Sequence, residues 1–435
     1  MIRKKLAVLV AAVITATSVL AGCGGAANKA PAETASTQAV DVSEGDAKVL
    51  NAGNMPTGGL FVMEDKDTEE YSEADAARAD KAMRAYEPAL GEEQLLINNS
   101  QHFYYYEQMD ADAQGMYDAM HQVAQDPQDT NNIAVFYTEL DPNGEEFIRM
   151  YFRSYYGLMY DHPELFWLYN GCEASIDVSY IKETDTSYKI YFHMNEPFAE
   201  FETQMTAFNN AVNEFLSDID MNGSDYEKAL AIHDKLIDLV IYDYDVLENE
   251  NSPESRMSLA HTAYGALVDN GKGQEHYAVC DGYSAAYTYL LGQAGVDSSV
   301  ILGLGGSSES ESGGHAWNVV KMDGDWYEVD STWDDMGNLE HAIPPGSDGY
   351  PYYEEAKANT EYYNKIQHYM FGLTTQEIRH FVPDSSYAYT SSDGKCQLTP
   401  VGECVHIRAN EVPDLQVQAN VVELAPEATG TRYGQ

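Results

Sequence analysis

The chain has 435 residues, 44% of them hydrophobic, which is enough for two domains or for one large domain with tails. Acidic residues outnumber basic residues by 71 to 24, which gives a formal net charge of −47. Proteins bind phosphate backbones through clusters of lysine and arginine, and this sequence has no such cluster after its first five residues, so we expect no nucleic-acid partner.

Residues 1–23 predict a lipoprotein signal peptide. Basic residues at positions 3–5 precede an apolar run, 6–20, that is too short to span a bilayer comfortably. The run ends in the letters LAGC, which resemble the bacterial lipobox, where the cysteine is diacylated and becomes the new N-terminus. We therefore expect Cys23 to anchor the protein to the extracytoplasmic face of the cell membrane, through lipid only.

An acidic low-complexity tether is predicted for residues 24–90. Residues 24–59 are rich in small and polar side chains and have too few large apolar residues to bury a core. Residues 63–87 are acidic and rich in alanine, which predicts a solvated helix.

Residues 91–215 predict a small N-terminal α+β unit. Apolar residues recur at helical spacing in 111–123 and 145–159. Strand-like segments lie at 133–139, 174–180 and 188–194. This unit carries no motif that ranks above a scaffold role.

A third region, residues 216–390, contains the candidate site. A helix is predicted at 199–218, at the entry to this region, and a second helix at 226–241. Ser224 and Glu227, at the start of the second helix, have the spacing of a capping box. A shorter helix is expected at 261–268, before a turn rich in glycine.

Cys280 stands at the start of a predicted helix. Unpaired N–H groups and the positive end of the helix dipole favour a thiolate at such a position, and the same N–H groups can hold an oxyanion. A small buried structural cysteine is the alternative. Residues 298–302 then predict a strand, and residues 303–314, rich in glycine and serine, predict a polar loop that is either a mobile gate or a plain connection.

A hairpin links His315 to Asp330. If Asp323-Gly324 is a two-residue turn, the numbers of opposed residues sum to 647, so His315 and Asp330 lie on one face as diagonal neighbours. Diagonal Cβ atoms are roughly 7 to 8 Å apart, which allows a hydrogen bond between imidazole and carboxylate. A thiol, a base and an orienting carboxylate in this order are typical of nucleophilic acyl transfer.

Other residues compete for these roles. His261 and His276 also lie near Cys280 in the sequence, but neither precedes a strand with a matching carboxylate. The alternative carboxylates are Glu328, Asp334 and Asp335. The first lies further from His315, and the other two lie where the strand should end.

Four motifs carry a resemblance to a known family: TAYGAL at 262–267, VCDGY at 279–283, GHAWN at 314–318 and WYEVDSTW at 326–333. Together they resemble the transglutaminase-like superfamily, in particular its bacterial exported branch, over residues 224–381. The resemblance implies a papain-like α+β fold in which the nucleophile helix packs on an antiparallel sheet, with no metal and no cofactor. It also implies the roles of nucleophile, base and orienting carboxylate for Cys280, His315 and Asp330.

The sequence departs from the family pattern at 274–277, four residues inserted between the glycine-rich turn and Cys280. Gln274 stands six residues before Cys280, a spacing that resembles the papain-like arrangement for an oxyanion donor. Tyr264 is the other candidate donor.

The remaining cysteines leave the pairing open. Cys396 and Cys404 can close a small loop in an exported protein, which would leave Cys172 alone. We do not expect these cysteines to bind a metal, because the sequence has no C-x-x-C spacing.

The sequence predicts a lipid-anchored extracellular thiol acyl-transfer enzyme that acts on amide bonds of proteins or cell-wall peptides. We expect a peptidase or amidase, because water as the acceptor needs no dedicated amine pocket; an amine acceptor would give a cross-linking transglutaminase. The alternative is a non-catalytic cell-surface binding module that uses the many tyrosines, 33 in all. Residues 391–435 are predicted to be a C-terminal tail without a role of its own.

Overall fold

The computed structural model describes residues 63–65, 103–169, 175–184, 186–194, 196–249, 255, 258–335, 343, 345–347, 349–394, 396–398, 401–411 and 425–433. The predicted signal peptide with Cys23, most of the tether and Cys172 lie outside the described residues. Among the helices of the described part, none is both long and apolar enough to cross a membrane.

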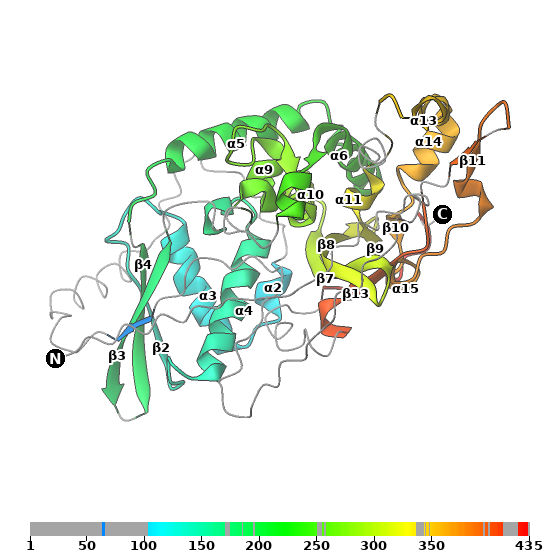
Figure 1. Cartoon of the computed structure of the whole chain (residues 1–435). Coiled ribbons are helices and arrows are strands. Elements are labelled where there is room, and N and C mark those ends of the chain that lie inside the picture. The colour runs from blue at the N-terminus through cyan, green and yellow to red at the C-terminus, as the bar shows by residue number, and fades with distance from the viewer. Residues whose placement is uncertain are drawn as a thin grey trace, which may run out of the picture.

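The N-terminal unit consists of a small sheet with two helices beside it (Figure 1). Its strand order is β1-β3-β4-β2. The strands are β1 (Met63–Asp65), β2 (Ala134–Thr138), β3 (Ile176–Thr184) and β4 (Ser187–Met194). The helices are α3 (Ala111–Ala124) and α4 (Glu145–Asp161). The predicted α+β mixture is confirmed, but Met63–Asp65 is a strand and not the start of a helix, because its backbone pairs in parallel with the edge of β3.

A five-stranded antiparallel sheet forms the centre of the second part, in the order β10-β9-β8-β7-β13. The strands are β7 (Ser298–Ser308), β8 (Glu311–Met322), β9 (Asp325–Val329), β10 (Phe371–Leu373) and β13 (Val405–Arg408). Asn318 pairs with Val329 and Met322 with Asp325, so the predicted sum of 647 is confirmed.

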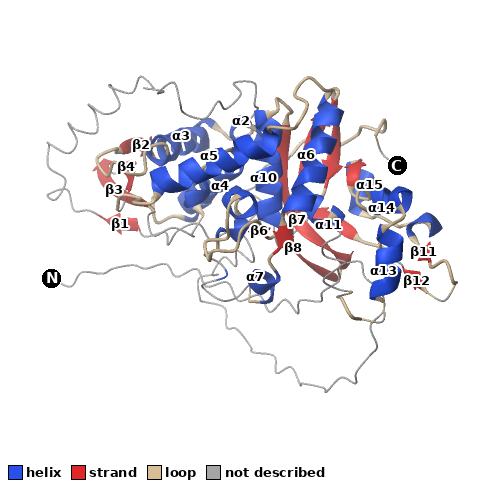
Figure 2. Cartoon of the chain, turned by 90° about the horizontal axis from the view of Figure 1, so that it is seen from above, coloured by secondary structure: helices blue, strands red, loops and turns tan. Residues whose placement is uncertain are grey.

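Helix α10 (Cys280–Gln293) packs against β7 and β8, next to α6 (Asp225–Leu239) and α9 (Ala263–Leu267) (Figures 1 and 2). The longer α5 is Phe201–Leu216. At the start of α6, Ser224 and Glu227 form the predicted capping box. A helix on an antiparallel sheet confirms the predicted α+β fold class.

Shorter elements complete the described chain. They are α2 (Tyr104–Glu107), η1 (Phe166–Leu168), β5 (Ile241–Tyr242), α7 (Tyr244–Glu248), η2 (Leu259–His261), β6 (Tyr277–Ala278), α11 (Ser331–Asp334), α13 (Tyr350–Lys357), α14 (Thr360–Ile366), α15 (Thr375–Arg379), η3 (Ser385–Tyr387), β11 (Tyr389–Thr390), β12 (Gln397–Leu398) and η4 (Ala409–Glu411). Helices α13 to α15 lie at the opposite end of the molecule from β2 to β4 (Figures 1 and 2).

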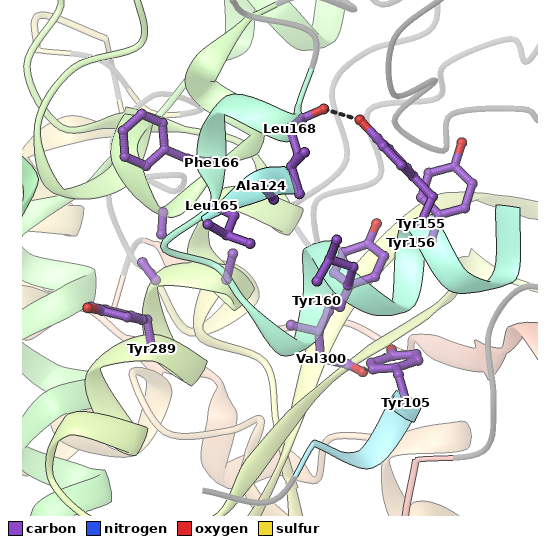
Figure 3. Close-up of a cluster of buried hydrophobic side chains, with 14 of the residues drawn as sticks. Tyr105, Ala124, Tyr155, Tyr156, Tyr160, Leu165, Phe166, Leu168, Tyr289 and Val300 are labelled. Atoms are coloured by element: carbon purple, nitrogen blue, oxygen red, sulfur yellow. Dashed lines mark hydrogen bonds between the residues drawn. The ribbon is translucent and has the colours of Figure 1, made fainter. Parts of the chain in front are cut away.

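The two parts share one hydrophobic core. A single cluster of buried side chains includes Phe147 and Phe166 from the N-terminal unit and Tyr289 and Val300 from the second part. Tyr105 of α2 lies beside Val300 of β7, and its hydroxyl donates a 2.6 Å hydrogen bond to the Val300 carbonyl (Figure 3).

The predicted loop at 303–314 is wrong: β7 extends to Ser308 and β8 begins at Glu311. The glycines that suggested a loop are required by close approach between strands. A Cβ atom on Gly303 would lie 2.1 Å from the Ile407 carbonyl oxygen, and one on Gly306 would lie 2.1 Å from the Glu311 carbonyl oxygen. Strand β7 therefore uses glycine to fit between its neighbours.

The C-terminal residues do not form a separate tail. Strand β13 pairs with β7, with His406 opposite Gly305 and Arg408 opposite Gly303. Backbone pairing between distant segments leaves little trace in local composition, so the sequence did not reveal it. Among the described residues Cys396 and Cys404 form no disulfide with each other.

Candidate active site

Cys280 is the first residue of α10, as predicted, and it is partly exposed. The start of the helix is held against η2, because the Val279 amide donates to the Ala260 carbonyl at 3.0 Å. A Cβ atom on Gly282 would lie 2.2 Å from the same carbonyl oxygen. Glycine at this position lets the first turn of α10 approach η2, and this contact fixes the position of Cys280.

His315 lies on β8 opposite Gly303, and its side chain is 7% exposed. Its ring covers Gly305, where a Cβ atom would come within 2.8 Å of the imidazole. The indoles of Trp317 and Trp333 stack on the ring at centroid distances of 5.9 and 5.1 Å. The two indole rings and the backbone at Gly305 therefore hold the imidazole in one orientation.

Asp330 leaves the end of β9 and caps α11. Its Oδ1 accepts the backbone N–H groups of Thr332 and Trp333 at 3.0 and 3.2 Å. Its Oδ2 accepts a hydrogen bond from His315 Nε2 at 2.6 Å. The structure thus brings His315 and Asp330 together as the hairpin count predicts.

Cys280 lies near His315, and its interaction with the ring favours the charged form of the imidazole and raises its pKa. Because Nε2 faces Asp330, Nδ1 is the nitrogen that remains for the thiol. Burial opposes a charge on His315, but Asp330 and Cys280 outweigh it and raise the pKa of His315 to about 10. An imidazolium between a carboxylate and a sulfur is the arrangement that supports a thiolate nucleophile.

A second histidine, which the sequence did not suggest, shares the same carboxylate oxygen. His406 Nε2 of β13 donates to Asp330 Oδ2 at 2.8 Å, and both side chains are fully buried. Burial lowers the pKa of His406 in spite of the nearby carboxylate, and its Nδ1 has no hydrogen-bond partner among the described residues. His406 is therefore a neutral donor that fixes Asp330.

The carboxylate of Asp330 receives four donors in total. Burial on its own would raise the pKa of Asp330, but His315 and His406 hold it well below its usual range. An ionised carboxylate without exposure to solvent can orient an imidazole and stabilise its positive charge.

The two candidate oxyanion donors have other contacts. Gln274 uses its side-chain carbonyl oxygen to accept a hydrogen bond from Asn270 Nδ2 at 2.6 Å. The ring of Tyr264 is buried and packs on Phe166 at a centroid distance of 4.5 Å.

The inserted residues 274–277 have a structural effect beside Cys280. They lead into β6, which pairs in parallel with β5, so that Tyr242 lies opposite Ala278. Burial, and then the charges of Cys280 and Asp281, raise the pKa of Tyr242 well above its usual range. Tyr242 is thus a neutral hydroxyl near the nucleophile, and local sequence gave no signal for it.

The competing histidines are engaged elsewhere. His261 Nδ1 contacts both carboxylate oxygens of Asp281 at 2.9 Å, and its ring stacks on Tyr169. His276 Nδ1 faces the Ala266 carbonyl at 3.3 Å.

The competing carboxylates also have partners of their own. Glu328 accepts from Trp317 Nε1 at 2.6 Å and forms a buried ion pair with Arg408. Asp335 accepts from the Tyr283 hydroxyl at 2.7 Å. Asp334 contacts His233 Nε2 at 3.1 Å.

Two groups of side chains in the described residues bring nitrogen and oxygen atoms as close together as metal ligands. One group is His315, Asp330 and His406, and the other is His233, Asp234 and His368. In the first group both imidazoles converge on one carboxylate oxygen, which two N–H donors satisfy.

One family model and two solved structures match parts of this chain. Residues 214–331 match the model of the transglutaminase-like superfamily. A solved TGase structure aligns with 37% of this chain and 44% of its own, at 16% identity and a TM-score of 0.25. A putative cysteine protease from Cytophaga hutchinsonii aligns with 36% of this chain and 62% of its own, at 12% identity and a TM-score of 0.22.

The chain spans less than two thirds of either solved structure, and no curated protein matches it. The matched region begins in α5, contains α6, α10 and the hairpin β8–β9, and ends just after Asp330. The chain therefore contains a domain of the transglutaminase-like superfamily, at residues 214–331.

Proposed function

We propose that the protein is a thiol acyl-transfer enzyme that cleaves amide bonds through Cys280, His315 and Asp330. The observation that carries the proposal is the 2.6 Å bond between His315 Nε2 and Asp330 Oδ2 beside a cysteine at the first position of α10. This combination supplies a nucleophile, a proton carrier and an orienting charge.

In the first half-reaction the sulfur of Cys280 attacks the carbonyl carbon of the amide. His315 already carries the thiol proton as an imidazolium, and it gives this proton to the leaving amine as the C–N bond breaks. The product of this step is a thioester on Cys280 and a free amine.

In the second half-reaction water attacks the thioester with His315 as the base. The C–S bond breaks, the carboxylic acid leaves, and the thiol is restored. An amine in place of water gives a new amide and hence protein cross-linking. Hydrolysis is the proposed outcome, because an amine acceptor needs a binding pocket of its own and water does not.

The oxyanion of each tetrahedral intermediate needs donors close to Cys280. The backbone N–H groups of the first turn of α10 point out of the helix N-terminus and suit this role. Gln274 and Tyr264 remain predicted contributors, the first through its amide nitrogen and the second through its hydroxyl.

The proposed substrates are proteins or cell-wall peptides outside the cell, reached from a lipid anchor on Cys23. The support is the lipobox-like sequence LAGC after an apolar run. The chemistry requires only side chains of this chain, so we propose no cofactor.

A thiol-directed electrophile tests the proposal. At neutral pH we expect a peptide-like electrophile to label Cys280 of the wild type far faster than Cys396 or Cys404, with the site read by peptide mass spectrometry. Cys280→Ala should lose the rapid phase. Equal labelling of wild type and Cys280→Ala would overturn the proposal.

The same assay measures the contribution of His406. His406→Phe removes the donor to Asp330 Oδ2 and should slow labelling about 10-fold, the usual effect of losing a hydrogen bond to a charged group. His406→Gln keeps an N–H donor and serves as the matched control. Labelling at the wild-type rate in His406→Phe would show that His406 does not position Asp330.

The acceptor can be identified with cell-wall material and a fluorescent amine. Mass spectrometry should find released peptides or amines that depend on Cys280, which indicates hydrolysis. Incorporated fluorescent amine would instead indicate a transglutaminase. Saturable wall binding with neither product would indicate a binding module.

A further inference from the structure

A second cluster of histidine and carboxylate side chains lies away from Cys280. His233 and Asp234 are neighbours on α6, and His368 lies in the segment between α14 and β10. Asp234 Oδ1 is 3.1 Å from His233 Nδ1 and 2.6 Å from His368 Nε2. The three ligand atoms all lie within 4.8 Å of one another.

The outer nitrogen of each imidazole faces an acceptor. His233 Nε2 lies 3.1 Å from Asp334 Oδ2, and Asp334 is itself fixed because its Oδ1 accepts the Met370 amide at 2.8 Å. His368 Nδ1 lies 2.6 Å from the Asn364 carbonyl. Metal-binding histidines are held in this way, by a carboxylate or a carbonyl that takes the outer N–H and sets the tautomer.

When a neutral ring carries its proton on the outer nitrogen, the lone pair of its inner nitrogen points at Asp234 Oδ1, which is also an acceptor. Acceptors that face one another need a cation between them, either a metal ion or an extra proton on each ring. The cluster also contains two carboxylates, Asp234 and Asp334, whose charges together match one divalent cation.

Two other histidine sites in the described chain lack these features. His406, beside Asp330, has an outer nitrogen without an acceptor among the described residues. His380 forms an exposed pair with Glu403 at 2.6 Å, and no third ligand accompanies it in the described residues.

We propose that His233, Asp234 and His368 bind a divalent transition-metal ion of the zinc class. Two imidazoles and one carboxylate suit zinc, with water as the fourth ligand. The side chains of Asp234 and His368 are 47% and 22% exposed, which gives the ion a path from solvent to the buried His233.

The bound ion would join α6 to the segment that precedes β10. This segment also contacts the candidate active site, because the Met370 carbonyl accepts a hydrogen bond from the backbone N–H of Asp330 at 3.1 Å. The role of the metal is structural: it stabilises the region behind Asp330 and takes no part in acyl transfer, so the inference is independent of the proposed activity.

Equilibrium dialysis of the full chain against zinc chloride tests the inference. The Cys280→Ser background removes the thiol as a competing ligand. We expect one zinc ion per chain and a melting temperature that rises with zinc. Cobalt in place of zinc should give the intense visible absorption of a four-coordinate site.

Variants then locate the ion. His368→Gln should weaken zinc binding at least 100-fold, and Asp334→Asn, which releases the outer N–H of His233, should weaken it about 10- to 100-fold. His380→Gln is the matched control and should bind zinc as the parent does. If His368→Gln does not fold by circular dichroism, the half-exposed Asp234→Asn replaces it.

Three results would overturn the inference. They are the absence of stoichiometric zinc binding in the Cys280→Ser protein, zinc binding that survives the substitutions of the ligands His368 and Asp234, and an equal loss of zinc binding in His380→Gln. Any of these would show that protons, and not a metal ion, satisfy the cluster.

Discussion

Asp330 organises the candidate site at the scale of single residues. One of its oxygens caps α11 and the other accepts from His315 and His406, so neither oxygen is left without a donor. A carboxylate held on all sides cannot rotate, and this fixes the direction in which His315 presents Nδ1. Because Asp330 and His315 are already held in this geometry, they do not have to reorganise during the reaction.

The pKa of His315 gives a testable prediction. We expect the imidazole resonances of His315 in an NMR titration to move with a midpoint near pH 10, against an ordinary value of 6.5. Asp330→Asn should lower the midpoint, because it removes the largest interaction that favours the charge. A midpoint near the ordinary value in the wild type would contradict the ion-pair geometry.

The sign of the effect on stability follows from linkage. A histidine with a raised pKa in the folded state stabilises the fold fully below its unfolded pKa of about 6.5, and this contribution is lost as the pH rises through about 10. The carboxylate of Asp330 has a lowered pKa, so its contribution is present above about pH 4 and is lost as the pH falls further.

The sequence predicted part of this site. Cys280, His315 and Asp330 could be found because a helix start and a two-residue turn set their positions through local geometry. His406 could not be found, because it reaches Asp330 only after β13 pairs with β7, and local composition does not specify a pairing between segments so far apart.

At the scale of elements, β7 is the strand that connects the site to the C-terminal residues. It pairs with β8, which carries His315, on one side and with β13, which carries His406, on the other. Its glycines let both neighbours approach. A composition that is typical of a loop therefore belongs to a strand inside the sheet, since the missing side chains make room for the His315 ring and for the carbonyl groups of Ile407 and Glu311.

Alanine substitutions in this hairpin should have opposite outcomes. Gly303→Ala places a methyl group against the Ile407 carbonyl and the Trp317 ring, so we expect a loss of about 1 to 3 kcal/mol in the free energy of unfolding. Gly313→Ala, on the neighbouring strand, meets nothing within 4 Å and should be tolerated. Urea unfolding measures both variants, and an equal effect of the two would argue against close packing at Gly303.

At the scale of the whole molecule, the order of helices and strands followed from periodicity, but the relation between the two parts did not. Helical and strand spacing are local properties, so the helices and strands predicted from 111 to 268 lie within a few residues of the observed ones, whereas the strand predicted at 298–302 extends to Ser308. The shared core depends on contacts such as the one between Tyr105 and Val300, which join residues distant in the sequence.

A shared core predicts cooperative unfolding. Peptides from α4 and α10 should lose protection at the same urea concentration when hydrogen exchange is followed by mass spectrometry. Tyr105→Phe removes the 2.6 Å donor to the buried Val300 carbonyl, which also accepts from Ser299 Oγ at 3.4 Å, and should shift both midpoints together, by about 1 kcal/mol. Two separate midpoints, or a shift confined to α4, would show that the parts fold independently.

The position of β13 after Cys280, His315 and Asp330 in the sequence has a consequence for synthesis. Cys280, His315 and Asp330 are all made before His406, so the three residues exist before strand β13 can join the sheet. In a chain that stops before β13, Asp330 therefore lacks the hydrogen bond from His406. Pairing of β13 with β7 thus completes the set of donors around Asp330 only after the three other site residues have been made.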